Sequence, residues 1–124
     1  MNGGDVFRFE KLDVWRKAVD LAGSVYRITR NFPDNERYGL VSQMRRAAVS
    51  VSSNIAEGSG RSTNRDFARF IEIAYGSVME IVSQLHIAQN QSFLQEQEAH
   101  DLYSQADEVA RMLSGLRSHL QRSK

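Results

Sequence analysis

The sequence predicts an all-α protein that folds as an antiparallel up-down four-helix bundle. Apolar residues recur at every third or fourth position through four long segments, and no segment alternates with the period of a β-strand. Clusters of Pro, Gly, Asn, Asp and Ser separate these segments, so the connections are short. Because short connections make neighbouring helices antiparallel, the chain is expected to form one domain over residues 1–124, with helices at about 12–31, 38–57, 65–90 and 95–120.

The first helix is expected to follow a short lead over residues 1–11. Asp13 lies near its start and Arg30 near its end, which suits the helix dipole. Pro33 disfavours a helical conformation at Phe32, so the helix is expected to end there. The apolar spacing predicts that this helix buries Leu12, Trp15, Val19, Ala22, Val25 and Tyr26.

The second helix carries two stripes at helical spacing, on separate faces. The apolar stripe consists of Leu40, Met44, Ala47, Val51 and Ile55. The polar stripe consists of Gln43, Arg46, Ser50, Asn54 and Glu57. Gly58 follows and opens the loop sequence GSGRS, so the helix is expected to end there in a left-handed C-cap.

The polar stripe is unusual for a solvated helix face. Ser and Asn are weak helix formers, because their side chains compete for backbone hydrogen bonds. Ser50 and Asn54 therefore need support from outside their own helix. Three interpretations remain open: a structural network or subunit interface, a plain solvated face, and a ligand or nucleic-acid site. The first is favoured, because structural networks also gather polar groups.

The third helix is expected to follow two N-cap candidates, Thr63 and Asn64. Gly76 lies in mid-helix, where glycine costs about 1 kcal/mol relative to alanine, so the close approach of a neighbouring helix is expected there. The nearby Ser77 and Glu80 are assigned to the same polar structural stripe as the residues of the second helix. The predicted core register consists of Phe67, either Phe70 or Ile71, Ala74, Val78, Ile81, Leu85 and Ala88.

The fourth helix follows a break at NQSFL, residues 90–94. Its apolar pattern is close to a heptad repeat, which is typical of a helix packed along its length. The expected core positions are Ala99, Leu102, Ala106, Val109, Leu113, Leu116 and Leu120.

Composition limits the classes of function. Hydrophobic residues make up 41% of the 124 residues, which is enough for a packed core. The net charge of +1 argues against a protein dominated by phosphate-backbone binding, although a local basic patch remains compatible with it. The absence of cysteine excludes disulfides, thiolate zinc sites and cysteine nucleophiles. Without a membrane-length apolar run or a signal pattern, a soluble cytoplasmic protein with no membrane partner is expected.

No residue pattern indicates catalysis, a metal or a cofactor. No Glu has a His three residues after it, as the helices of a di-metal carboxylate bundle would require. Of the three histidines, His86 neighbours the core positions of the third helix and is interpreted as structural. GSGRS lacks the Gly-Lys-Ser/Thr ending of a phosphate loop. The chain is therefore expected not to be an enzyme and to bind no cofactor.

Positive charge concentrates on the second and third helices and the loop between them, at Arg45, Arg46, Arg61, Arg65 and Arg69. One interpretation is a partly buried ion-pair network with Glu57, Glu72 and Glu80, because the planar arginine side chain binds carboxylates bidentately. The other is a contact surface for the backbone of RNA or DNA. The network is favoured and the second interpretation stays open.

Three stretches of the chain carry a resemblance to a known family. They are FEKLDVWRKAVDLAGSVYRITRNFP, YGLVSQMRRAAVSVSSNIAEGSGR and DFARFIEIAYGSVMEIVSQL. They resemble the family of proteins encoded in intervening sequences of bacterial 23S ribosomal RNA, from about Phe9 to Leu116. RRAAVS followed by SNIAEG is the most specific part. The family commonly has a proline two residues before the asparagine, where this chain has Ser52.

The resemblance implies a four-helix bundle that assembles as a homopentamer, and it implies no enzymatic activity. It suggests a scaffold or adaptor whose biochemical role is unknown. Relatives include the accessory protein of diversity-generating retroelements, a basic pentameric barrel that binds a reverse transcriptase and nucleic acid. With a net charge of +1, this chain is less basic than that role suggests. A nucleic-acid-binding accessory factor is accordingly the alternative hypothesis.

Overall fold

The computed structural model describes residues 4–123, and all regular secondary structure in that range is helical. The all-α prediction is therefore confirmed for the described chain. The four long helices are α1 (Asp13–Thr29), α2 (Ser42–Ser59), α3 (Asn64–Asn90) and α4 (Glu96–Arg122). Three short elements precede α1 and α2: η1 (Arg8–Lys11), η2 (Asp34–Glu36) and the π-helical turn η3 (Arg37–Val41).

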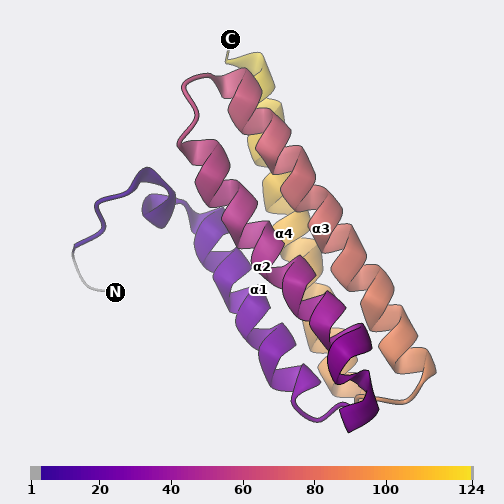
Figure 1. The fold of residues 1–124 in the computed structure, drawn as a ribbon. Coiled ribbons are helices and arrows are strands. Elements are labelled where there is room, and N and C mark those ends of the chain that lie inside the picture. The colour runs from indigo at the N-terminus through magenta and orange to yellow at the C-terminus, as the bar shows by residue number, and fades with distance from the viewer. Residues whose placement is uncertain (1–3, 124) are drawn as a thin grey trace.

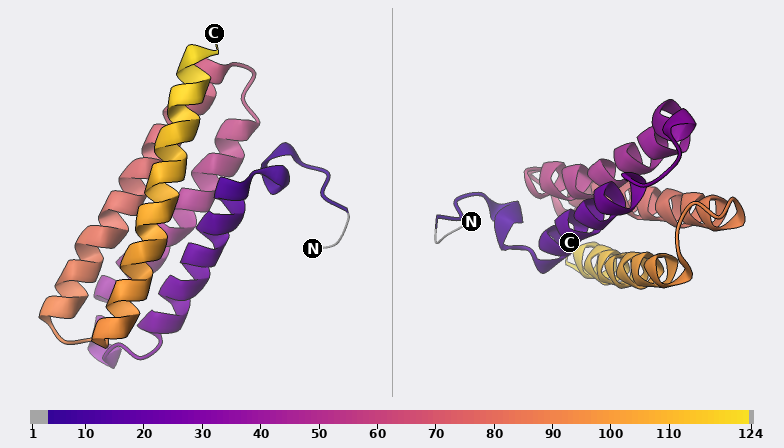
Figure 2. Two further views of the ribbon diagram at one scale, coloured as in Figure 1. Left: turned by 180° about the vertical axis from the view of Figure 1, so that it is seen from behind. Right: turned by 90° about the horizontal axis from the view of Figure 1, so that it is seen from below.

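The four long helices lie alongside one another, and each runs in the opposite direction to the one before it (Figure 1). Contacts join α1 to α2, α2 to α3, α3 to α4 and α4 back to α1. The view from behind shows α4 between α3 and α1 (Figure 2). The α2–α3 loop and the C-terminal end lie at one end of the bundle, and the other two connections lie at the opposite end (Figure 1). None of the helices within residues 4–123 combines the length and apolar character needed to cross a membrane.

The helix ends follow from local hydrogen bonds. The Thr63 hydroxyl accepts a hydrogen bond from the Asp66 amide at 3.1 Å, which caps the start of α3. At the end of α3, the Phe93 amide donates to the Ala88 carbonyl at 2.9 Å and Ser92 adopts a left-handed φ of 62°. This arrangement is a Schellman motif, in which a serine takes the place usually held by glycine.

The left-handed C-cap expected at Gly58 is wrong. Helix α2 continues to Ser59, and Gly60 caps it with a right-handed φ of −89°. Gly58 is buried inside the helix, where an added Cβ would lie 2.7 Å from the Cβ of Phe70 and 2.9 Å from Cδ1 of Phe67. The glycine therefore permits α2 and α3 to approach closely at this end of the bundle.

The close approach expected at Gly76 is also wrong. A Cβ added there would meet no atom within 4 Å, so no neighbouring helix requires this glycine. The small residue that the α2–α3 contact does need lies on the other helix, at Gly58.

The buried stripes of α2, α3 and α4 match the predicted registers, with Ile71 rather than Phe70 in the core and Leu116 half-buried. The register predicted for α1 is wrong in part. Val19 and Tyr26 are 43% and 38% exposed. The core face of α1 instead consists of Val14, Ala18, Leu21, Ser24, Val25 and Thr29. Two overlapping apolar stripes run along this helix, and contacts with α2 and α4 decide which of them is buried.

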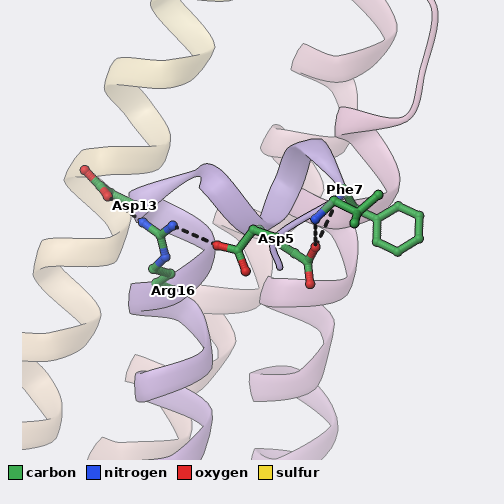
Figure 3. A network of polar contacts seen from close by, with 6 residues as sticks. Asp5, Phe7, Asp13 and Arg16 are labelled. Atoms are coloured by element: carbon green, nitrogen blue, oxygen red, sulfur yellow. Dashed lines mark hydrogen bonds and ion pairs between the residues drawn. The ribbon is translucent and has the colours of Figure 1, made fainter. Parts of the chain in front are cut away.

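Residues 4–11, the described part of the lead before α1, project from the side of the bundle and are bound to it near α1 (Figures 1 and 2). Arg16 pairs with Asp13 at 3.1 Å and reaches Asp5 at 3.6 Å (Figure 3). Arg8 donates to the Ser59 carbonyl at 3.3 Å and lies over the Phe67 ring. These contacts bind the lead to α1 and to the Gly58 end of the α2–α3 pair.

We expect Gly58→Ala to destabilise the fold although alanine favours helix. Overpacking typically costs about 1–3 kcal/mol, which exceeds the gain in helix propensity of about 1 kcal/mol. The free energy of unfolding, measured by urea denaturation, should fall. Gly76→Ala is the matched control and should raise stability by up to about 1 kcal/mol, because open space surrounds Gly76. Equal effects of the two substitutions would contradict this account of the helix contact.

Candidate functional site

The polar stripe of α2 meets α3 through a small hydrogen-bond network. The hydroxyl oxygens of Ser50 and Ser77 are 2.9 Å apart. The Asn54 side-chain amide donates to the Ser50 carbonyl at 2.8 Å and to the Ser50 hydroxyl at 3.0 Å. Ser77 is only 5% exposed, so the network closes over the interior of the α2–α3 contact. Three of the seven residues assigned to the polar stripe are thus brought together.

The other four residues of the predicted stripe lie outside this network. Gln43, Arg46 and Glu80 line a hollow between the first turns of α2 and the middle of α3. Glu57 pairs with Arg61 at 3.1 Å, four residues further along the chain. The stripe therefore has a structural centre at Ser50 and exposed residues on both sides of it.

The predicted arginine cluster is divided between two ends of the bundle. Arg45 and Arg46 lie in the second turn of α2, whereas Arg61 follows its far end, and Arg65 and Arg69 lie in the first two turns of α3 beside that end. At 1.5 Å per helical residue, about 20 Å separates Arg46 from the end of α2. The five side chains consequently cannot contact one ligand as a single patch.

Arg45 is a structural residue. Its Nε donates to the Thr29 hydroxyl at 2.9 Å, and its guanidinium lies 4.6 Å from the centre of the Tyr26 ring. Thr29 is buried and in turn donates to the Val25 carbonyl. Arg45 thereby ties the start of α2 to the last turns of α1.

A hollow lies at the α2–α3 loop, and Arg61 is not part of its lining. Arg65 and Arg69 line it and form no ion pair with any described residue. The Asn64 amide closes one side by donating to the Ser123 carbonyl at 2.7 Å. Arg61 lies over the Phe70 ring, 4.6 Å from its centre, in addition to its pair with Glu57. Ser62, Thr63, Ala68, Glu72, Leu120 and Gln121 complete the lining.

The expected ion-pair network does not form within residues 4–123. Of the three carboxylates, only Glu57 pairs with an arginine of the cluster. Glu72 pairs instead with Arg117 of α4 at 3.8 Å, and Glu80 forms no ion pair with a described residue. Helical periodicity places these residues on neighbouring faces but does not reveal that α4 approaches Glu72.

The histidines lie on the surface. His86 is exposed, with its ring 6.4 Å from that of Tyr103, so it neighbours the core without being part of it. Among the described residues, no three His, Asp or Glu side chains come close enough to hold a metal ion.

Two residues of interest were not singled out in the sequence. Tyr38 is 90% exposed in the π-helical turn η3, where Gly39 departs from helical geometry. Gln84 is 8% exposed, and its Oε1 accepts no hydrogen bond from a described residue. A buried acceptor left unpaired costs about 1–3 kcal/mol. The sequence does indicate that Gln84 is buried, because it lies between the predicted core positions Ile81 and Leu85.

The Ser50–Ser77 bond should be detectable as an energetic coupling. We expect Ser50→Ala and Ser77→Ala each to cost about 1 kcal/mol, because each leaves a partner unpaired. The double variant should lose less than the sum, by about 0.5–1.5 kcal/mol. Urea denaturation of all four proteins measures the coupling, and Ser53→Ala on the exposed face of α2 provides the control. Strict additivity would show that the two hydroxyls do not interact.

Comparison with known proteins gives one family and one fold. A family model described as 23S rRNA-intervening sequence protein matches residues 10–115. The chain matches none of the curated proteins to which it was compared. Its fold is similar to the crystal structure of a protein of unknown function from the S23 ribosomal protein family of Bacteroides thetaiotaomicron, with a TM-score of 0.78 and 16% identity. The alignment covers 85% of this chain and 95% of that one.

Proposed function

The chain belongs to the family of 23S rRNA-intervening sequence proteins, and from this membership we propose that it is a non-enzymatic scaffold or adaptor that works as an oligomer. The proposal includes an antiparallel up-down bundle as the subunit, a homopentamer as the assembly and the cytoplasm as the location. No cofactor is required, because the proposed role is to present surfaces to partners.

The observation that supports an oligomer is the apolar surface of α3 and α4. Tyr75, Met79 and Tyr103 are 37%, 42% and 50% exposed, and they share one groove between these helices. Ala106 and Ala110 form the floor of the groove. An exposed apolar groove rimmed by polar residues, here Asp107 and Arg111, is typical of a protein–protein contact.

A ring assembly needs two different complementary faces on each subunit. Contacts of that kind are heterologous and close into a ring when the rotation between subunits permits it. The α3–α4 groove supplies one apolar face. In this proposal, a second surface of a neighbouring copy covers Tyr75, Met79 and Tyr103.

We expect light scattering after size exclusion to give five times the mass of the chain, unchanged between low and high salt. Met79→Glu should shift the mass toward that of the monomer, because it places an unpaired charge in an apolar contact. Val19→Glu, at an equally exposed apolar residue of α1, is the matched control and should leave the mass unchanged. A monomeric parent protein would refute the oligomer.

A second candidate function is nucleic-acid binding. It is favoured by Arg65 and Arg69, which line one hollow without an ion pair to a described residue. Free guanidinium groups suit phosphate, which they bind through two parallel hydrogen bonds. The relation to the accessory protein of diversity-generating retroelements, and a reverse transcriptase as partner, belong to this candidate.

We expect Arg65→Glu with Arg69→Glu to weaken binding of a short structured RNA by about tenfold or more at low salt, and to reduce the salt dependence of the affinity. Fluorescence anisotropy over a salt series measures both. Lys11→Glu with Lys17→Glu makes the same change in net charge on η1 and α1, and should have a much smaller effect. Equal losses in the two double variants would mean that the RNA responds only to net charge.

A further inference from the structure

The hollow between the start of α2 and the middle of α3 is separate from the hollow at Arg65 and Arg69. It has a volume of about 370 Å³, within the range of about 300–1,000 Å³ that is usual for small-molecule pockets. Its lining consists of Tyr38, Ser42, Gln43, Arg46, Ala47, Ser50, Glu80 and Gln84. Seven of these eight residues have a side-chain group that can form hydrogen bonds.

The inner wall of the hollow contains a buried polar group without a partner. Gln84 is more than nine-tenths buried, and its Oε1 accepts no hydrogen bond from any described residue. Buried polar groups in proteins are nearly always paired. The Oε1 atom itself has almost no solvent-accessible surface, so a ligand that brings an N–H donor can pair with it once the Gln84 amide turns toward the hollow.

The rim adds two opposite charges that are not used for an ion pair. Arg46 and Glu80 both line the hollow, and neither forms an ion pair with a described residue. Glu80 can accept further N–H groups, whereas the Arg46 guanidinium can donate to a carbonyl or a phosphate. The ligand that matches this set has both donors and acceptors along one edge.

Tyr38 gives the hollow an aromatic rim. It is 90% exposed and also lines a second hollow, which it shares with Tyr26, Arg37 and Arg45. Arg46, Ser42 and Ser50 are common to both hollows, so the two form one continuous surface around the first turns of α2. Exposed aromatic rings interleaved with arginine are typical of surfaces that bind single strands by stacking.

We propose that the Gln84 hollow binds one unpaired base of a single-stranded RNA, and that it prefers a base with an exocyclic amino group. Gln84 and Glu80 accept hydrogen bonds from the base edge, Tyr38 stacks on the face of the base or of its neighbour, and Arg46 donates to the base carbonyl or the phosphate. This inference rests on the second candidate function, nucleic-acid binding, and adds a base-reading site to it.

The test compares fluorescein-labelled decamers of cytidine and of uridine by fluorescence anisotropy with the full chain. Cytosine has an exocyclic amino group and uracil has none. We expect the cytidine decamer to bind about fivefold to tenfold more tightly, the effect of one or two hydrogen bonds. Gln84→Leu should abolish this preference, and Tyr38→Ala should weaken binding of both decamers about equally.

Gln89→Leu is the matched control, because Gln89 is exposed on the same helix and undergoes the same chemical change. It should leave the preference intact. Gln84→Leu should also keep or raise the midpoint of thermal unfolding, since it removes an unpaired buried acceptor. A lower midpoint would show that the amide has a structural partner and would overturn the proposal.

The remaining outcomes separate this proposal from the one on which it rests. If both decamers bind with equal affinity, or if the preference survives Gln84→Leu, the base site is refuted while nucleic-acid binding stands. If no RNA binds at any salt concentration, both are refuted. If Gln84→Leu changes the oligomeric mass and leaves the base preference intact, the hollow is a contact between copies and the base site is again refuted.

Discussion

The close contact between α2 and α3 is the constraint on which the rest of the bundle depends. It requires the absence of a side chain at Gly58, where a Cβ would collide with Phe67 and Phe70. It also requires small polar residues at its centre, where the hydroxyls of Ser50 and Ser77 meet at 2.9 Å. A larger residue at either place would push the helices apart, and apolar residues at Ser50 and Ser77 would remove the hydrogen bonds that fix their register. The lead is bound at the same end, through Arg8 and the Ser59 carbonyl.

The residues available to a partner are those that the contacts between the helices do not use. Arg45 is occupied by Thr29 and Tyr26, and Arg61 by Glu57 and Phe70. Arg46, Arg65 and Arg69 remain without an ion pair to a described residue, at two separate ends of α2. A partner that contacted both ends would have to extend along the bundle, as an RNA strand or a second subunit can.

Much of this fold was predictable from the sequence, because helical periodicity depends on chemistry that is local along the chain. The core registers of α2, α3 and α4 follow directly from their apolar spacing. Where two stripes overlap, as at Val19 and Leu21 of α1, only tertiary contacts decide which is buried. The prediction that α2 ends at Gly58 was wrong for the same reason. A buried glycine at a helix contact and a glycine at a helix end look alike in sequence. The pairing of Glu72 with Arg117 joins residues 45 positions apart, and no spacing rule reports it.

The hydrogen bond from Asn64 to the Ser123 carbonyl has a practical consequence for handling the protein. It fixes the last described residues of the chain against the hollow of Arg65 and Arg69. A purification tag or fluorophore attached close to Ser123 would add its own charge and bulk beside that hollow. Binding assays of the arginine group should therefore use labels attached to the lead, which projects away from the bundle on its own side (Figure 2).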